Sequence, residues 1–347
     1  MSSRRRQMKS IKYWLLFALL GVFLHAQAPK EPIDFSQNRE IYGVKQIEQI
    51  KNWGVNSPTS GVVSGSVMQM QGVAVGPLDS GKPLKGIEAE RGLGELFTIL
   101  QGKYFAPIFL AIIILVPLAF ASHLMIFKSK VFSHGVKYKV FSTYNIAIHW
   151  LAAMPFVAIC ITGVIMVFGD KLGGGTFVRL ARDIHGICTI AFAIFGPLMF
   201  LMWVKDSLPK TYDLKWILML GGYLTPGKTM TQPIPSGKFN AGMKMWFWTC
   251  TIGGFVMIIT GAFLFFQFAP INALRLSAII HNFLGFVIIA LLFTHIYMSV
   301  FAIEGALSAM TDGTMGEEEL AILHSYYYNE LKSQGKLEKM KIEGAHH

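Results

Sequence analysis

Long apolar runs separated by polar, basic segments form the dominant pattern of this chain. A helix needs about 20 consecutive apolar residues to cross the hydrocarbon core of a membrane. Five runs are long enough, and they cover residues 105–127, 144–168, 185–204, 245–268 and 276–302. The pattern predicts an all-α membrane protein. Composition agrees, because 53% of the residues are hydrophobic, 15% are charged, and the mean hydropathy is +0.47.

The first residues have the pattern of a secretory signal. A basic stretch that ends at Lys9 precedes an apolar run from Trp14 to Leu24, and Ala26-Gln27-Ala28 matches a cleavage site. We therefore expect residues 1–28 to be a cleavable signal peptide, with an uncleaved signal anchor as the alternative. In both cases residues 29–104 form an exported, periplasmic segment.

The basic residues of the loops predict the orientation of the spans. The loops 128–143 and 205–244 are rich in lysine, whereas the loop 269–275 carries only Arg275. The positive-inside rule places the two lysine-rich loops, and the tail 303–347, in the cytoplasm. The formal net charge of +11 is then mostly an orientation signal, and no nucleic-acid-binding motif accompanies it. Several tryptophans near span ends are typical of an interfacial belt, although they could instead line a ring-shaped ligand; they are Trp150, Trp203, Trp216, Trp246 and Trp248.

Histidines inside the apolar spans are the most informative residues. His281 and His295 lie 14 residues apart on one predicted helix. That spacing corresponds to about 21 Å along the axis, with both rings within about 40° of the same side. His149 and His185 lie near the starts of two other spans. Imidazole is a common axial ligand of haem iron, and polar residues inside spans are functional candidates.

The direction of each span pairs these histidines by depth. His149 and His295 fall near the cytoplasmic face, and we call them the inner pair. His185 and His281 fall near the opposite face, and we call them the outer pair. Each pair predicts one haem b with two histidine ligands and no open coordination position, which suits electron transfer. No Cys-x-x-Cys-His sequence for covalent haem attachment is present. In the alternative, each histidine only hydrogen-bonds a backbone carbonyl or a hydroxyl.

Polar residues near these histidines are further candidates. Arg179 and Arg182 precede His185 and could pair with haem propionates, or they could be solvated loop charges. Asn240 and the Gly242 backbone lie at the cytoplasmic end of the fourth span and could donate hydrogen bonds to a quinone. The alternative for Asn240 is a helix cap. Lys244 is a further possible propionate contact.

Four stretches of the sequence resemble the cytochrome b (gamma) subunit of respiratory, membrane-bound formate dehydrogenases. The resemblance covers about 135–325, and the Phe-Asn-Ala-Gly-x-Lys part is its most specific element. Its motifs are Tyr144–Trp150, Arg182–His185, Lys238–Trp248 and the His281…His295–Met298 spacing. Isolated span histidines also occur in the cytochrome b family of nickel–iron hydrogenases.

The resemblance implies a four-helix di-haem cytochrome b domain at 128–302 that binds two haems b. It also implies menaquinone reduction near the inner haem, where Asn240, Gly242 and His295 match quinone-side residues. Met243 stands where some relatives carry Gln. The implied partners are an iron–sulfur beta subunit and a molybdenum- or tungsten-pterin alpha subunit that oxidises formate, on the outer side of the bacterial inner membrane. The extra helix 105–127 departs from the shortest members, which have four spans.

Two alternatives remain at this point. The chain could be the cytochrome b subunit of a nickel–iron hydrogenase, in which hydrogen supplies the electrons through a partner. It could also be a haem-free membrane anchor or transporter. Against transport, no span contains an acidic residue or a Lys/Arg relay, and no inverted repeat is evident.

Overall fold

The structure is a computed structural model of the 347-residue chain, and it describes residues 87–133 and 135–342. The predicted signal peptide and most of the predicted exported segment lie outside the described residues. The described part is mostly helical, which confirms the predicted all-α class. Five helices are long and apolar enough to cross a membrane: Leu93–Phe127, Thr143–Val167, Gly175–Trp203, Ala241–Phe266 and Ile271–Ala302.

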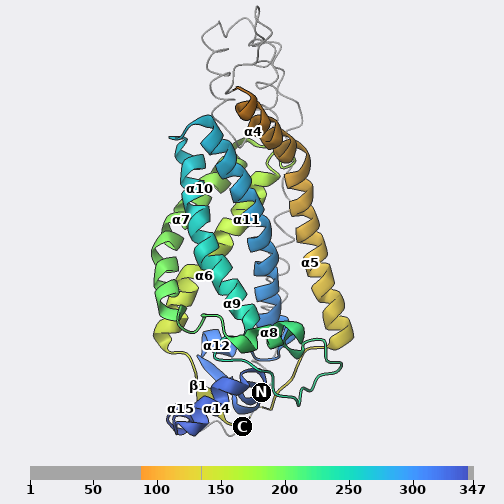
Figure 1. Ribbon diagram of the computed structural model, residues 1–347, viewed down its shortest axis with the longest axis vertical. Helices are drawn as coiled ribbons and strands as arrows, with labels where there is room; N and C mark the ends of the chain where they lie inside the picture. The colour runs from red at the N-terminus through yellow and green to blue at the C-terminus, as the bar shows by residue number, and fades with distance from the viewer. Residues whose placement is uncertain (1–86, 134, 343–347) are drawn as a thin grey trace, which may run out of the picture.

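Four of these helices run side by side along the long axis of the molecule (Figure 1). They are α6 (Thr143–Val167), α7 (Gly175–Trp203), the helix formed by α9 to α10, and α11 (Ile271–Tyr297). The third of them comprises α9 (Ala241–Trp248), the π-helical η3 (Thr249–Gly253) and α10 (Gly254–Phe266). All four paired histidines of the sequence lie on helices of this bundle.

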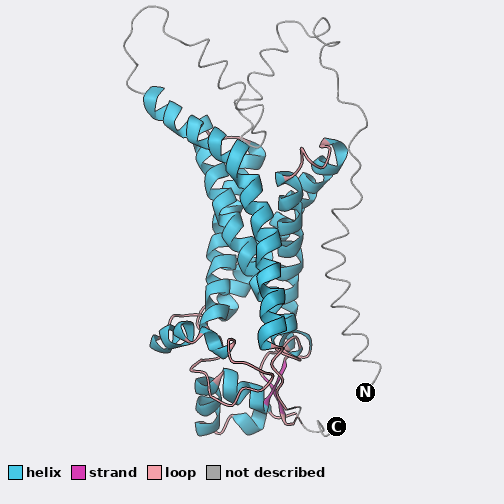
Figure 2. Cartoon of the chain, turned by 90° about the vertical axis from the view of Figure 1, so that its right-hand side faces the viewer, coloured by secondary structure: helices cyan, strands magenta, loops and turns pink. Residues whose placement is uncertain are grey.

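The remaining span is α5 (Phe105–Phe127), which lies along α11. The π-helical η1 (Leu100–Tyr104) joins it to α4 (Ile87–Ile99). In Figure 2, α4 leans away from the bundle axis at the end opposite the strands. Phe109 of α5 packs directly on α11, where a Cβ added to Gly285 would lie 3.2 Å from its ring. A small residue at this position therefore permits close approach of the two helices.

Hydrogen bonds at the start of α6 explain where that helix begins. The Ser142 hydroxyl accepts from the Asn145 backbone N–H at 3.2 Å, and the Asn145 side chain accepts from the Ser142 N–H at 3.0 Å. This reciprocal capping box satisfies backbone donors that the first turn of a helix leaves free. It fixes the start of α6 less than two turns before His149.

Three spans of the bundle begin at least four residues earlier than the hydrophobic pattern predicts, and one of them, the α9 to α10 helix, starts at Ala241. α7 starts at Gly175, so Arg179 and Arg182 belong to a helix and not to a loop. α11 starts at Ile271, which includes Arg275, whose guanidinium donates to the Asn272 side chain at 3.0 Å. Hydropathy misses these first turns because they contain charged residues, although they continue the helices.

Three segments cover one end of the bundle, which we call the capped end: residues 128–142, 204–240 and 303–342. They include a two-stranded antiparallel sheet, in which Tyr138 of β1 (Lys137–Lys139) pairs with Met315 of β2 (Thr314–Gly316). Figure 1 shows this cap at the lower end. Its other elements are short: α8 (Thr211–Leu218), η2 (Leu220–Gly222), η4 (Met298–Ala302), α12 (Ser308–Thr311), α13 (Glu317–Leu323), α14 (Ser325–Ser333) and α15 (Leu337–Met340).

The acidic run at Glu317 begins helix α13. Acidic side chains in a first turn interact favourably with the helix dipole. Glu319 is nevertheless buried, with 8% of its surface exposed. Burial raises the pKa of this carboxyl to about 7, against a smaller lowering by a backbone hydrogen bond from Gly316.

We predict that Glu319 makes the cap less stable as the pH rises. A carboxyl with a raised pKa binds more protons in the folded state, so stability falls between about pH 4.5 and 7. Glu319→Gln should flatten this dependence and raise stability above pH 7, by about 3 kcal/mol at most. Thermal unfolding of both proteins in detergent from pH 5 to 8 measures it. Parallel pH curves for the two proteins would contradict the prediction.

Candidate functional site

The structure brings the four span histidines together as two pairs. In the inner pair, the ring centroids of His149 on α6 and His295 on α11 are 6.4 Å apart. In the outer pair, the ring centroids of His185 on α7 and His281 on α11 are also 6.4 Å apart. These are the two pairs that depth along the spans predicts, and α11 contributes one ring to each.

The ring spacing fits a metal ion held between two imidazoles. The midpoint lies about 3.2 Å from each centroid, half of the 6.4 Å separation. A bond from a metal to an imidazole nitrogen is about 2.0 Å long. The remaining distance of about 1.2 Å matches the distance from a ring nitrogen to the centre of a five-membered ring. Within the described residues no group of three or more His, Cys, Asp or Glu could hold a metal ion. Each pair therefore offers two imidazole rings as metal donors.

Threonine hydroxyls orient both rings of the outer pair. Thr162 Oγ1 lies 3.1 Å from His185 Nδ1, and Thr260 Oγ1 lies 2.9 Å from His281 Nδ1. Each hydroxyl donates its own proton to the carbonyl four residues earlier in its helix. Its oxygen therefore accepts from Nδ1–H, which leaves Nε2 of each ring unprotonated and available to a metal.

The same three residues, Ile-Thr-Gly, occur beside each ring of the outer pair. A Cβ added to Gly163 would lie 3.5 Å from His185 Cε1, and one added to Gly261 would lie 3.5 Å from His281 Cε1. Thr162 and Thr260 are functional candidates that the analysis of the sequence missed. The repeated Ile-Thr-Gly at 161–163 and 259–261 is the signal that could have revealed them.

Indole rings surround the inner pair. Trp246 stacks on His295, with ring centroids 5.2 Å apart and an interplanar angle of 17°, and Trp203 lies 6.2 Å from His149. The belt prediction is wrong for these two tryptophans, because they face histidines inside the bundle. Among the described residues, His149 Nδ1 and Trp203 Nε1 are buried without a hydrogen-bond partner. Unpaired buried polar atoms of this kind are costly and often mark a ligand site.

The predicted propionate contacts differ in what they already bind. Arg179 donates to the Thr176 hydroxyl at 2.9 Å, and Arg182 forms an exposed ion pair with Asp183 at 3.1 Å. Both lie on the first turns of α7, before His185. Lys244 is buried, and its ammonium lies 2.9 Å from each carboxylate oxygen of Asp213. Its charge is thus neutralised within the protein.

The predicted quinone-side residues surround the start of α9. The Asn240 side-chain oxygen, Oδ1, accepts from the Met243 backbone N–H at 2.9 Å, so Asn240 is the cap that the alternative interpretation predicts. Gly242 lies under Trp216, whose ring would be 2.9 Å from an added Cβ. The Met243 side chain is exposed. Asn240 keeps its amide N–H groups for another partner.

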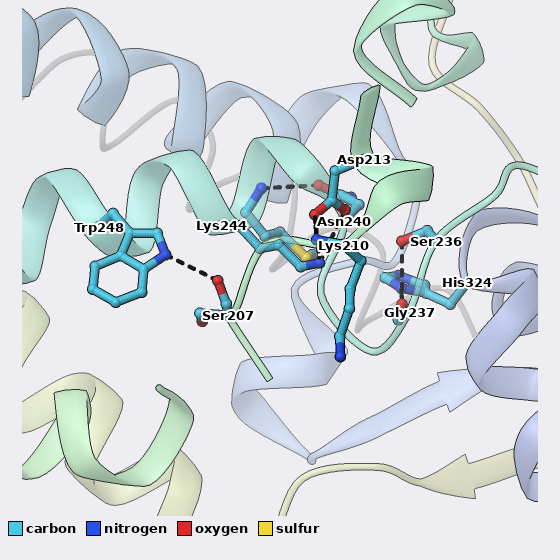
Figure 3. A network of polar contacts seen from close by, with 10 residues as sticks. Ser207, Lys210, Asp213, Ser236, Gly237, Asn240, Lys244, Trp248 and His324 are labelled. Atoms are coloured by element: carbon cyan, nitrogen blue, oxygen red, sulfur yellow. Dashed lines mark hydrogen bonds and ion pairs between the residues drawn. The ribbon is translucent and has the colours of Figure 1, made fainter. Parts of the chain in front are cut away.

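A pocket of about 430 Å³ lies next to these residues, between α8, α9 and α11. This volume is within the range of small-molecule sites. Figure 3 shows the polar network at the pocket, in which Lys244 points to Asp213 and Trp248 donates to the Ser207 carbonyl. Asp213 and Lys244 are the charged residues of the lining, which consists of Pro209, Asp213, Ile217, Ala241, Lys244, Met245, Trp248, Thr249 and Leu291 and is otherwise mostly apolar.

We predict that Thr162→Val and Thr260→Val weaken binding at the outer pair. Each change leaves Nδ1–H without its acceptor, and loss of such a partner typically lowers metal affinity by about 10- to 100-fold. Transfer of the predicted haem to excess apomyoglobin measures the loss. Thr251→Val is the matched control, because the Thr251 hydroxyl is also buried but bonds only the Phe247 carbonyl. Equal transfer rates in all three variants would contradict the prediction.

Comparisons with known proteins agree with this geometry. The nitrate-inducible formate dehydrogenase cytochrome b556(Fdn) subunit of Escherichia coli (strain K12) is 28% identical over 200 residues, which is 55% of this chain and 91% of that protein. The formate dehydrogenase cytochrome b556 subunit of Haemophilus influenzae is 26% identical over 192 residues, 52% of this chain and 78% of that protein. The predicted resemblance is thus confirmed.

The sequence model of the family described as prokaryotic cytochrome b561 matches residues 140–313. The matched region contains all four paired histidines and runs from α6 to α12, whereas α4 and α5 lie outside it. Because the match covers half of the 347 residues and the whole paired site, this chain belongs to the prokaryotic cytochrome b561 family.

Proposed function

We propose that this chain is the electron-transfer membrane subunit of a formate dehydrogenase complex. In this proposal it binds two haems b and carries electrons to menaquinone at the capped end. The observation that carries the proposal is the presence of two histidine pairs with the same 6.4 Å ring spacing at two depths of one bundle. The names of the relatives from Escherichia coli and Haemophilus influenzae supply the formate dehydrogenase context.

The chain's own residues prepare each proposed haem site. Thr162 and Thr260 hold the outer rings with Nε2 free, while Trp203 and Trp246 exclude water from the inner rings. A bound haem b with two histidine ligands supplies one-electron redox chemistry without an open position for oxygen. His281 and His295 are separated by about 21 Å along α11. In this proposal the two sites therefore lie near opposite sides of the membrane.

Charge supports a cytoplasmic position for the capped end. The cap carries most of the lysines that adjoin spans, and the positive-inside rule assigns such loops to the cytoplasm of the bacterial inner membrane. The C-terminal elements belong to the same end. The outer pair then faces the periplasm, where the proposed iron–sulfur beta subunit and the molybdenum- or tungsten-pterin alpha subunit would deliver electrons from formate.

The pocket at the capped end is the proposed menaquinone site. Its apolar walls suit the quinone ring, and Asn240, Gly242, Met243 and His295 lie on the helices around it. Reduction of a quinone consumes two electrons and two protons. The Lys244 ammonium can donate a proton to a quinone oxygen, and the neighbouring Asp213 carboxylate can then take up a proton from the cytoplasm and pass it to the amine. A second round of the same transfer supplies the second proton. Electrons thus cross inward while protons are taken up from the cytoplasm.

The source of electrons lies in a partner chain. A hydrogenase cytochrome b subunit would bind its haems in the same way, but the similar proteins named above belong to formate dehydrogenases. Reduction of the purified complex by formate and not by hydrogen would support the proposal, and the reverse result would assign the chain to a hydrogenase. A haem-free anchor or transporter leaves the paired rings without an explanation.

We predict that His295→Ala removes the inner haem and leaves the outer one. The outer ligands, His185 and His281, keep their threonine bonds in this variant. Haem b per chain should fall from about two to about one, measured by the pyridine haemochrome method, and menaquinone reduction should be lost. In the control His324→Gln, whose parent ring bonds the Gly237 carbonyl at 2.9 Å, both haems should remain. A full haem complement in His295→Ala would show that the inner assignment is wrong.

We also predict that Asp213→Asn and Lys244→Gln slow menaquinone reduction while formate still reduces both haems. The reason is that the pair is the only charged part of the described pocket lining. Steady-state kinetics with a menaquinone analogue measures the effect. Asp206→Asn is the control, because Asp206 pairs with Lys238 at 3.3 Å outside the pocket lining. Unchanged quinone kinetics in both pocket variants would refute a role for the pair.

A further inference from the structure

Helix α5 contacts α11 at two levels, although it lies outside the region that defines the family. Near the outer end, Phe105 and Phe109 pack on Phe286, with ring centroids 5.7 and 4.5 Å from it. Near the capped end, Phe120 stacks on Tyr297 at 4.4 Å and 13°. The apolar contacts hold the two helices together along most of their length.

A polar contact joins the same helices at the level of the inner pair. His123 of α5 lies with Nδ1 2.7 Å from the Tyr297 hydroxyl and with Nε2 3.2 Å from the Tyr223 carbonyl oxygen. A carbonyl can only accept, so Nε2 carries a proton. In the neutral ring Nδ1 then accepts from Tyr297. Both ring nitrogens of His123 are thereby used.

Tyr297 follows His295 by two residues, which is about 200° around a helix. The two side chains therefore lie on opposite sides of α11. His295 faces His149 and Trp246, whereas Tyr297 faces α5. A bond that holds Tyr297 fixes the rotation of this turn about the helix axis, and with it the direction of the His295 ring.

The hydrogen-bonding pattern of the helix changes at this point. The α-helical hydrogen bonding of α11 ends at Tyr297, and the π-helical η4 begins at Met298. π-Helical segments are rare and often accompany functional sites. The bond to Tyr297 thus lies where the helix changes its hydrogen-bonding pattern, two residues after His295.

The second bond of His123 reaches the other side of the capped end. Tyr223 follows directly on η2, and its ring lies 6.5 Å from that of Trp216. Trp216 in turn covers Gly242 at the start of α9. His123 thus ties α5 both to the turn that carries His295 and to the segment beside the quinone-side residues.

We propose that α5 is a working part of the inner haem site and that His123 is its positioning residue. His123 acts through Tyr297 to set the orientation of the His295 ring. The inference rests on the proposed function, because it requires a haem at the inner pair. The His149 and His295 planes are inclined by 55°. The angle between two axial imidazole planes sets the electron paramagnetic resonance (EPR) signal of low-spin ferric haem, and outer contacts of a ligand tune the potential of its metal.

Tyr297→Phe in the purified complex tests this directly, because it removes the hydroxyl and keeps the stacked ring. We expect the EPR g-values and the midpoint potential of the inner haem to shift, with both haems retained and the outer haem unchanged. His123→Phe should shift the same signals. Adding His123→Phe to Tyr297→Phe should produce little further shift, because the bond between the two residues is already absent. His123→Gln can accept from Tyr297 and should restore most of the native signal.

Two controls separate positioning from general loosening. Phe109→Leu weakens the packing of α5 on α11 far from the inner pair, and Ser122→Ala changes an exposed neighbour of His123 that bonds only its own helix. Neither should move the inner signal. Unchanged signals in both Tyr297→Phe and His123→Phe would overturn the proposal, as would an equal shift in Phe109→Leu. Fewer than two haems in the unmodified complex would instead refute the proposed function.

Discussion

The need of buried imidazole rings for partners on both nitrogens underlies the whole structure. An apolar bundle offers little water, so a buried ring nitrogen that meets no hydroxyl, carbonyl or ligand is costly, as is His149 Nδ1. In the outer pair, the hydroxyls of Thr162 and Thr260 accept a hydrogen bond from Nδ1 of each ring. Nε2 of each ring is then free to bind a metal. His123 differs, because one of its ring nitrogens contacts the Tyr297 hydroxyl and the other contacts the Tyr223 carbonyl. It therefore has a structural role and no free nitrogen for a metal.

The rest of the molecule follows from placing two such pairs on one helix. α11 supplies His281 and His295, so the other rings must come from helices that adjoin it at two depths. α6 supplies His149 near the capped end, and α7 supplies His185 near the other end. The cap then covers the inner pair with short helices and a two-stranded sheet. The buried Asp213–Lys244 pair of the cap lies beside an apolar pocket. A hydrophobic substrate of quinone type would fit such a pocket and would need the protons that this pair can transfer.

Much of this arrangement could be predicted from the sequence, for physical reasons. Hydropathy locates spans because the membrane imposes their length, and the direction of each span sets the depth of its histidines. Thr162 and Thr260 were missed, and Trp246 was assigned to the interfacial belt, because their roles depend on rotations of helices against each other. The same holds for the His123–Tyr297 bond, which joins residues 174 positions apart. The starts of α7 and α11 were misplaced because Arg179, Arg182 and Arg275 lie on helical turns that hydropathy counts as loop.

The central claim is that the two histidine pairs each hold one haem b. Counting haem per copy of this chain by the pyridine haemochrome method, on the purified complex in detergent, tests it most directly. The account predicts about two haems b per chain, both reduced when formate is added. A well-folded complex that contains this chain and no haem would contradict the account.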